Sequence, residues 1–300
     1  MALAMAKKGK ASKGLKASLR RFEEAEKLMK KREHQLASQK NFAAQKKKSI
    51  NGGGKAQSNQ KGFVPFDTEN TVLLVGEGDF SFAVSVVKNN HILPSNLVAT
   101  SYDRRDVATE KYTTATNNLE YLESRGVKVL FEIDATKLPQ TLGLSSKKNK
   151  STLFAANQKL DVILFNFPHT GKGIKDMDRN VRDHQKLVLQ YFQSCNQLFP
   201  MVNERSSDAA FSGYSKANDE RIVLSTFEGE PYLSWGIKAI ARSEEWKVQR
   251  SGRFDWDLFP EYHHRRTNSM KDTTKEASVR DARIYVFERR LEEPVNKNTQ

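Results

Sequence analysis

The sequence predicts an α/β protein with a mostly parallel, seven-stranded sheet and helices on both of its faces. Short apolar runs recur along the chain, and between them lie segments whose apolar residues are spaced by three and four positions, as in helices. The first run, residues 72–75, stops at the turn Gly76-Glu77-Gly78, where two glycines let the chain bend sharply beside a ligand. Strands that alternate with helices in this way form a parallel sheet that is covered on both faces.

Each strand is expected where a short apolar run lies between turn or helix signals. The expected strands are residues 72–75, 96–102, 127–133, a run that begins at residue 160, and residues 221–227, 246–251 and 282–288. The expected helices are residues 79–87, about 106–125, 180–199 and 235–241. Residues 138–159 are less regular, and a serine-rich loop is expected over 203–219.

Charge divides the chain into a basic arm with its linker, residues 1–62, and a domain, residues 63–300. The arm holds 17 Lys and Arg and 4 Glu, so it carries +13 of the net charge of +14. Such an arm indicates binding to a polyanion, of which nucleic acid is the commonest, and a merely solubilising tail is the alternative. We expect this arm to be disordered, with Lys46, Lys47 and Lys48 contacting RNA or forming part of a nuclear import signal.

Composition argues against several other classes of protein. The single cysteine, Cys195, rules out an internal disulfide and a cysteine-based zinc site, and it lies on the apolar side of an expected helix. The chain has no apolar run of 18 residues and no apolar core near its N-terminus, so we expect neither a membrane span nor secretion. No set of His and carboxylate residues has metal-ligand spacing, so no metal is expected.

The ends of four expected strands carry glycine or polar residues that suit a nucleoside ligand. In a parallel sheet these ends meet at one edge, and ligands bind there. Asp103, 25 residues after Gly78, is placed to accept both ribose hydroxyls, although it is as well placed to cap the next helix. Asp134, with Ala135 after it, is placed to reach an adenine amino group.

The glycine-rich loop favours S-adenosylmethionine over a dinucleotide. A dinucleotide loop has a third glycine where Ser81 stands, and Glu77 puts a carboxylate where a pyrophosphate would lie. A nicotinamide-dependent oxidoreductase is therefore disfavoured, whereas a cationic ligand without phosphate suits the loop. The residues expected to bind this cofactor are Gly76, Glu77, Gly78, Asp79, Phe80, Ser81, Asp103, Asp134 and Ala135.

Four stretches together resemble one enzyme family. They are residues 74–82 (LVGEGDFSF), 99–103 (ATSYD), 165–171 (FNFPHTG) and 262–267 (YHHRRT). They are similar to the eukaryotic large-subunit (25S) ribosomal RNA methyltransferases that modify N3 of uridine, and the likeness spans about residues 63–290. The resemblance implies a Rossmann-like class I methyltransferase fold, S-adenosylmethionine as donor, a pre-ribosomal (pre-60S) RNA substrate and a location in the nucleus and nucleolus. We expect a monomer. The alternative is a ribosome-assembly factor that binds RNA and has lost transfer.

The stretch Asn166-Phe167-Pro168-His169 is expected to hold the target base. It resembles the Asn-Pro-Pro-Tyr loop of amino-directed methyltransferases, and the Asn166 amide can both accept from and donate to an imide. Pro168 would fix the loop, and Phe167 or His169 could stack on a base that has left its helix. His169 could also take the N3 proton, but a loop histidine without a catalytic task is as plausible, and Asn166 could be a plain turn residue.

A second polar group, His263, His264, Arg265 and Arg266, follows an aromatic-rich segment. Two adjacent histidines make a poor chelate, which argues against a metal. We expect these residues to contact phosphate and base near the mouth of the site, with simple surface charge as the alternative.

Overall fold

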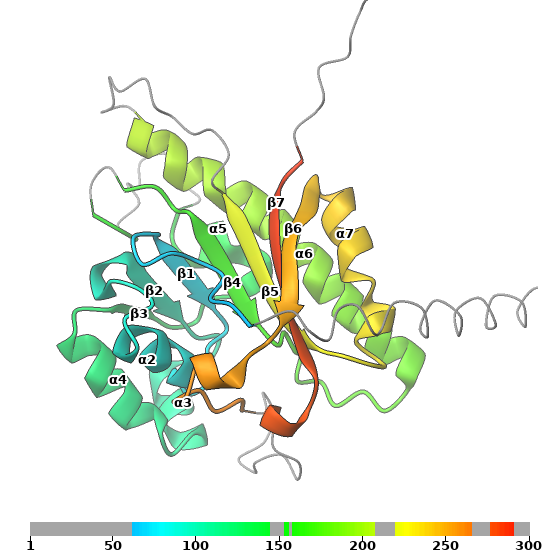
Figure 1. Ribbon diagram of the computed structural model, residues 1–300, viewed down its shortest axis with the longest axis horizontal. Coiled ribbons are helices and arrows are strands. Elements are labelled where there is room, and N and C mark those ends of the chain that lie inside the picture. The colour runs from blue at the N-terminus through cyan, green and yellow to red at the C-terminus, as the bar shows by residue number, and fades with distance from the viewer. Residues whose placement is uncertain (1–61, 145–152, 156–157, 208–219, 266–276, 291–300) are drawn as a thin grey trace, which may run out of the picture. The chain divides into compact units, whose positions relative to one another are not determined.

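The computed structural model describes residues 62–144, 153–155, 158–207, 220–265 and 277–290 (Figure 1). The sheet has seven strands in the order β3-β2-β1-β4-β5-β7-β6. The strands are β1 (Val72–Val75), β2 (Leu97–Thr100), β3 (Lys128–Leu130), β4 (Val162–Asn166), β5 (Arg221–Phe227), β6 (Trp246–Arg253) and β7 (Ala282–Arg289). β7 runs antiparallel to β5 and β6, and the other neighbouring pairs are parallel. The predicted mostly parallel sheet of seven strands is confirmed.

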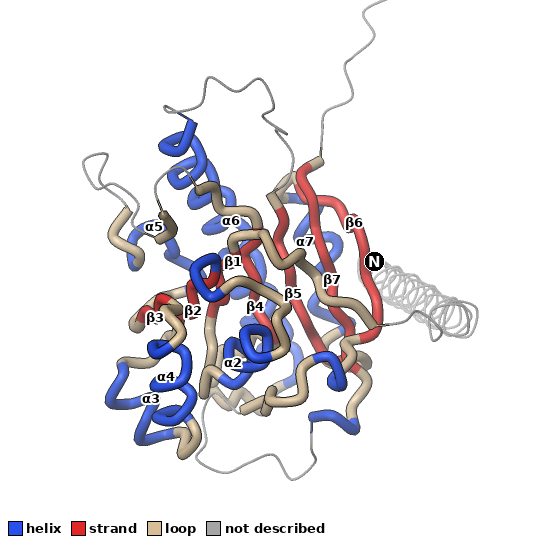
Figure 2. The backbone as a smooth tube through the Cα atoms, turned by 60° about the vertical axis from the view of Figure 1, so that its left-hand side comes forward, coloured by secondary structure: helices blue, strands red, loops and turns tan. Residues whose placement is uncertain are grey.

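Helices cover both faces of this sheet, as predicted (Figure 2). They are α2 (Ser81–Lys88), α3 (Arg105–Lys111), α4 (Ala115–Ser124), α5 (Leu138–Thr141), α6 (Met177–Ser207) and α7 (Ile237–Ser243). Short 3-10 turns span Pro94–Asn96, Ala135–Lys137, Leu233–Trp235, Trp256–Leu258 and Ala277–Val279. No helix of the described residues is long and apolar enough to cross a membrane.

The two faces of β1 belong to separate apolar clusters, because successive side chains of a strand point to opposite faces. Val72 and Leu74 pack with residues of α2 and α4, whereas Leu73 and Val75 pack with residues of α6 and α7. All four side chains are buried, which explains why this strand is a continuous apolar run. β1 is next to the central strand, β4, and the strand order reverses between these two strands.

All four expected helices have other bounds in the structure, and the difference is large for two of them. The helix expected over about 106–125 is broken into α3 and α4, because the backbone is extended at Tyr112. The Thr114 hydroxyl, just before α4, donates to Asp79 Oδ2 at 2.9 Å. α6 starts earlier than expected, since Asp176 Oδ1 accepts from Arg179 N at 2.8 Å and satisfies its first turn. It also continues past Pro200 to residue 207, so it includes part of the expected serine-rich loop.

Candidate active site

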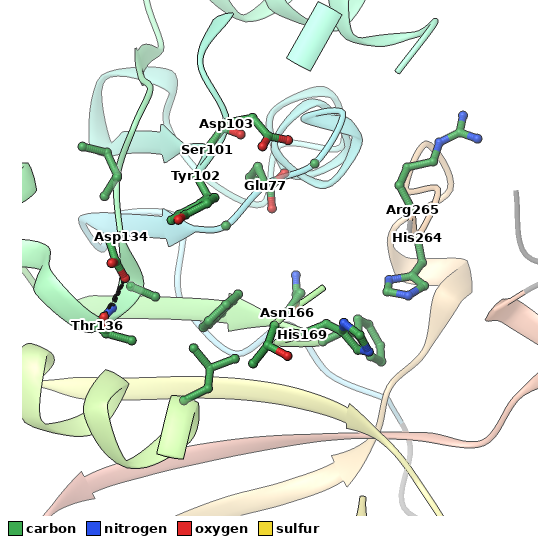
Figure 3. Close-up of a pocket in the computed structure, with 18 of the residues that line it drawn as sticks. Glu77, Ser101, Tyr102, Asp103, Asp134, Thr136, Asn166, His169, His264 and Arg265 are labelled. Atoms are coloured by element: carbon green, nitrogen blue, oxygen red, sulfur yellow. Dashed lines mark hydrogen bonds between the residues drawn. The ribbon is translucent and has the colours of Figure 1, made fainter. Parts of the chain in front are cut away.

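A cavity of about 380 Å³ lies where the carboxyl ends of β1, β2 and β4 meet (Figure 3). This is the edge at which open α/β sheets bind ligands, and the volume lies in the range of small-molecule pockets. Residues that the sequence predicted for the site and that line this cavity are Gly76, Glu77, Gly78, Asp79, Asp103, Asp134, Ala135, Asn166, Phe167, His169, His263, His264 and Arg265. Lys46, Lys47, Lys48 and Arg266 lie outside the described residues.

The glycine-rich loop needs glycine at residue 76, where its backbone passes very close to a neighbouring ring, whereas a Cβ at residue 78 would make ordinary contacts. Gly76 has φ +71°, and a Cβ there would lie 2.6 Å from the Phe165 ring. A Cβ at Gly78 would lie 3.4 Å from the Tyr112 ring and 3.6 Å from Cβ of Arg265. The loop is therefore a close-fitting backbone wall of the cavity.

Glu77 lies in this loop with its carboxyl group turned into the protein. It is 7% exposed, and its Oε2 accepts a hydrogen bond from Ala83 N at 3.2 Å. Burial raises the pKa of Glu77 to about 8, although the bond from Ala83 N acts in the opposite direction. The carboxyl group is thus mostly protonated at neutral pH. The negative loop expected from the sequence forms only when the pH rises or a cation binds beside it.

Phe80 and Ser81 were predicted to bind the cofactor, but neither residue lines the cavity. The Phe80 ring is buried and packs on Phe131 with ring centroids 5.6 Å apart. The Ser81 hydroxyl accepts from His263 N at 3.0 Å. Both side chains point into the protein at the start of α2, so they support the loop from the side away from the cavity.

Tyr102, Asp103 and Asp134 lie on one side of Asn166, and His264 and Arg265 on the other (Figure 3). Asp103 Oδ2 pairs with Lys111 Nζ at 2.9 Å, and α3 begins without a side-chain cap, so Asp103 does not cap that helix. Asp134 Oδ1 accepts from the Thr136 backbone N–H at 2.8 Å and from its hydroxyl at 2.7 Å. These bonds fix two carboxylates at the end of the cavity predicted for adenosine.

Asn166, the last residue of β4, has an unused donor. Its Oδ1 accepts from the Ser225 hydroxyl at 2.8 Å. Its Nδ2 is buried and has no hydrogen-bond partner among the described residues. A buried amide without a partner costs free energy that a bound acceptor would recover. The Asn166 amide is therefore the candidate donor to a ligand at this end of β4.

The Phe167 ring forms part of the cavity wall rather than a free stacking surface. Phe167 has φ +48°, an uncommon conformation for a residue with a side chain, and it is 8% exposed. Its ring stacks on Trp256 at 5.6 Å and packs on Phe227 at 4.6 Å. Pro168 does not line the cavity. The expectation that Phe167 stacks on the base is thus at odds with a ring already packed among aromatic neighbours.

The His169 imidazole is a hydrogen-bond donor at Nε2. Its Nδ1 accepts from Gly171 N at 2.9 Å, which leaves the proton of the neutral ring on Nε2. Burial, and then the neighbouring His184 ring at 4.7 Å, lower the pKa of His169 below its usual value. A neutral ring with its proton on Nε2 cannot accept another proton there. The structure therefore argues against His169 as the acceptor of the N3 proton.

Residues 259–265, here called the clamp segment, pack along α2 and the glycine-rich loop. Arg265 Nε pairs with Asp79 Oδ2 at 2.9 Å. Glu261 Oε2 accepts from the Ser85 hydroxyl at 2.9 Å, and the Tyr262 ring packs on Phe82 at 5.3 Å. Residues about 180 positions apart in the sequence therefore form one side of the cavity.

The clamp segment changes the roles expected for its histidines and arginine. Burial, followed by the charge of Arg280, lowers the pKa of His264 to about 4, so this ring is neutral and cannot attract phosphate by charge. It packs on Phe167 at 5.0 Å instead. Arg265 is bound to Asp79, whereas His263 is exposed and lines the cavity, so its role as an RNA contact stays a prediction.

The family model described as rRNA (uridine-N3-)-methyltransferase BTM5-like matches residues 73–266. The chain belongs to this BMT5-like family. A relative from Saccharomyces cerevisiae, named 25S rRNA (uridine(2634)-N(3))-methyltransferase, is 39% identical over 309 residues, which are 93% of this chain and 92% of that protein. The Mus musculus ferredoxin-fold anticodon-binding domain-containing protein 1 homolog is 35% identical over 73% of this chain and 31% of its own length. A solved antibiotic-related methyltransferase matches 77% of this chain and 98% of its own at 10% identity, with a TM-score of 0.38.

The BMT5-like match runs from β1 to the residue after the clamp segment, so it includes every wall of the cavity. Several lining residues were missed by sequence reasoning. They are Tyr102, Tyr112, Thr170, Lys172, Asp183, Lys186, Gln190 and Tyr262. The spacing of 183, 186 and 190 on one face of α6, soon after Asn166, was a signal that could have found three of them. No group of three His, Cys, Asp or Glu residues in the described part of this BMT5-like chain could hold a metal ion.

We expect Arg265→Ala to destabilise this BMT5-like protein by about 3 kcal/mol, because it leaves the Asp79 carboxylate buried without its cation. Urea denaturation followed by circular dichroism measures this change. The matched control is Arg105→Ala, which breaks an exposed ion pair with Glu123 and should cost less than about 1 kcal/mol. Equal losses in the two variants would contradict a structural role for the Arg265 pair.

Proposed function

We propose that this protein transfers a methyl group from S-adenosylmethionine to N3 of a specific uridine in large-subunit ribosomal RNA. The observation that carries the proposal is the buried, unpartnered Nδ2 of Asn166, at a strand end that faces the glycine-rich loop across one cavity. Uracil offers two carbonyl oxygens beside N3, and the Asn166 amide can donate to one of them. Membership of the BMT5-like family supports the same reaction.

The residues of the cavity fit S-adenosylmethionine. The glycine-rich loop, where Gly76 leaves no room for a side chain, suits the methionine part, and Glu77 lines the same part of the cavity, where a carboxylate suits the ammonium group. Asp103 suits the ribose, and Asp134 with Ala135 suits the adenine. When bound, this cofactor supplies an electrophilic methyl carbon on a sulfonium.

The target uridine has to leave its base pair before it reaches the site, because N3 lies on the Watson–Crick edge. Inside the cavity Asn166 would orient the base, and the His169 Nε2–H provides a second donor. Orientation of this kind supplies much of the rate of a displacement reaction. We place the basic arm, residues 1–62, on RNA phosphates of a pre-60S particle in the nucleolus.

The test is incubation of the protein with radiolabelled S-adenosylmethionine and large-subunit RNA from cells that lack the enzyme. The RNA is then digested to nucleosides, which are separated and identified by mass. Label in 3-methyluridine is the expected result. Absence of label from RNA and from pre-ribosomal particles, with the cofactor bound, would favour the inactive assembly factor.

Cofactor affinity is expected to rise about tenfold between pH 6 and pH 7. Glu77 has a pKa of about 8 in the free protein, and a neighbouring cation favours its ionised form, so binding releases a proton below that pH. Calorimetry in two buffers with different ionisation enthalpies measures the release. Glu77→Gln should lose this pH dependence. An affinity that stays constant over this range in the wild type would exclude a cation beside Glu77.

A further inference from the structure

Several polar residues of the cavity are poorly suited to accept the proton of uridine N3. N3 of uridine carries a proton that has to leave during methylation. Asn166 has an amide, which does not take up a proton, and His169 already has its Nε2 protonated. The Asp103 and Asp134 carboxylates lie at the adenosine end, and Glu77 is turned toward α2. Another group has to accept the proton.

We propose that Asp183 of α6 is the general base that takes the N3 proton, an inference that rests on the proposed function. Asp183 lines the same cavity as Asn166 and His169. Its Oδ2 is buried and has no hydrogen-bond partner among the described residues. The cavity thus holds one buried donor without a partner, on Asn166, and one buried acceptor without a partner, on Asp183. An imide offers a carbonyl oxygen beside an N–H, which matches this pair.

The loop that continues from His169 holds the Asp183 carboxylate ionised. Lys172 Nζ binds Asp183 Oδ1 at 2.5 Å, whereas Oδ2 has no hydrogen bond of normal geometry among the described residues. Burial acts to raise the pKa of Asp183, but hydrogen bonds from Lys172 and Thr170 and the Lys172 charge together lower it below its usual value. The other charged or titratable groups around it are His169, His184 and Lys186.

A weakly basic carboxylate suits this reaction. The N3 electron pair forms a bond to the methyl carbon, and the electron pair of the breaking carbon–sulfur bond goes to sulfur. Positive charge develops on N3 as its new bond forms, so its proton becomes far more acidic and passes to Asp183 Oδ2. The products are 3-methyluridine, a neutral thioether and a protonated carboxyl group that returns its proton to water. Proton transfer late in the step requires little basicity.

The test compares Asp183→Asn with the wild type in cofactor affinity, in turnover on unmethylated large-subunit RNA and in the pH profile of turnover. Asp183→Asn keeps the shape of the side chain and removes its basicity. We expect unchanged cofactor affinity by calorimetry and turnover about 100-fold lower at pH 7. The control is Asp178→Asn on the same helix, an exposed residue that does not line the cavity, and it should behave as the wild type.

The pH profile separates a base from a residue that only shapes the site. Turnover by Asp183→Asn should rise about tenfold per pH unit above pH 7, because uridine that has lost its N3 proton needs no base. RNA made with 5-fluorouridine, whose N3 proton is more acidic, should reduce the deficit at pH 7. The wild type should change little over the same range.

Three results would overturn the inference. Asp183→Asn turnover within about threefold of the wild type would show that no base acts at this position. A deficit that is the same at every pH, or a loss of cofactor affinity, would assign Asp183 a structural or cofactor-binding role. A wild-type protein that makes no 3-methyluridine would instead remove the proposed function itself, which those three results leave standing.

Discussion

Asn166→Ala is expected to bind S-adenosylmethionine as the wild type does and to methylate RNA about 100 to 1,000 times more slowly. Deleting one preorganised donor at a reacting carbonyl has an effect of about this size. The Nδ2 atom that makes this donor is buried and without a partner in the described structure, so its role begins only when the base arrives. Calorimetry with the cofactor and single-turnover kinetics with RNA separate the two properties.

Two further variants identify the atom responsible. Asn166→Asp keeps the shape of the side chain but has no N–H group, so it should be as slow as Asn166→Ala. Ser225→Ala removes the hydroxyl that holds Asn166 Oδ1 at 2.8 Å but leaves the amide, so we expect a loss below about tenfold. A fully active Asn166→Asp would refute the donor role.

Gly76→Ala is expected to lower cofactor affinity by at least about 100-fold, or about 3 kcal/mol. A methyl group there would come 2.6 Å from the Phe165 ring, so the loop or the ring has to move within the wall of the cavity. The positive φ of this residue adds backbone strain of about 1 kcal/mol. Calorimetry measures the affinity, and thermal denaturation measures the stability of the same sample.

Gly126→Ala is the matched control for Gly76→Ala. Gly126 also has a positive φ, +78°, but a Cβ there would meet nothing within 4 Å. This variant should therefore lose about 1 kcal/mol of stability from strain and keep its cofactor affinity. If Gly76→Ala behaved in the same way, the glycine would serve only the turn, and the cradle assigned to it would be wrong.

The parts of the fold that depend on local pattern could be predicted from the sequence. β5 has the predicted bounds, Arg221–Phe227, because its apolar run is long and has a polar segment on each side. The four strand ends that suggested a nucleoside site, at residues 76, 103, 134 and 166, all line the cavity. Strand ends can be predicted because parallel topology brings them to one edge.

The parts that failed depend on contacts between distant segments. The break after α3 follows from Thr114 binding Asp79, 35 residues away, and the neutral state of His264 follows from burial against Phe167. Arg265 looked like a phosphate contact because its partner, Asp79, is 186 residues away. Asp183 was not predicted as a site residue because a charged residue on a helix is usually exposed to solvent. Composition and local spacing do not show which distant segments come together, although the spacing of residues 183, 186 and 190 does place Asp183 on one face of α6 with two other lining residues.

The clamp segment affects how the protein can fold while it is being synthesised. The glycine-rich loop is made early, but the residues that hold Asp79, Ser81 and Ser85 in place are Arg265, His263 and Glu261. A nascent chain has to extend beyond residue 265 before this wall can close. Chains that end before residue 261 would therefore contain the glycine-rich loop without the contacts that Glu261, His263 and Arg265 make to it and to α2.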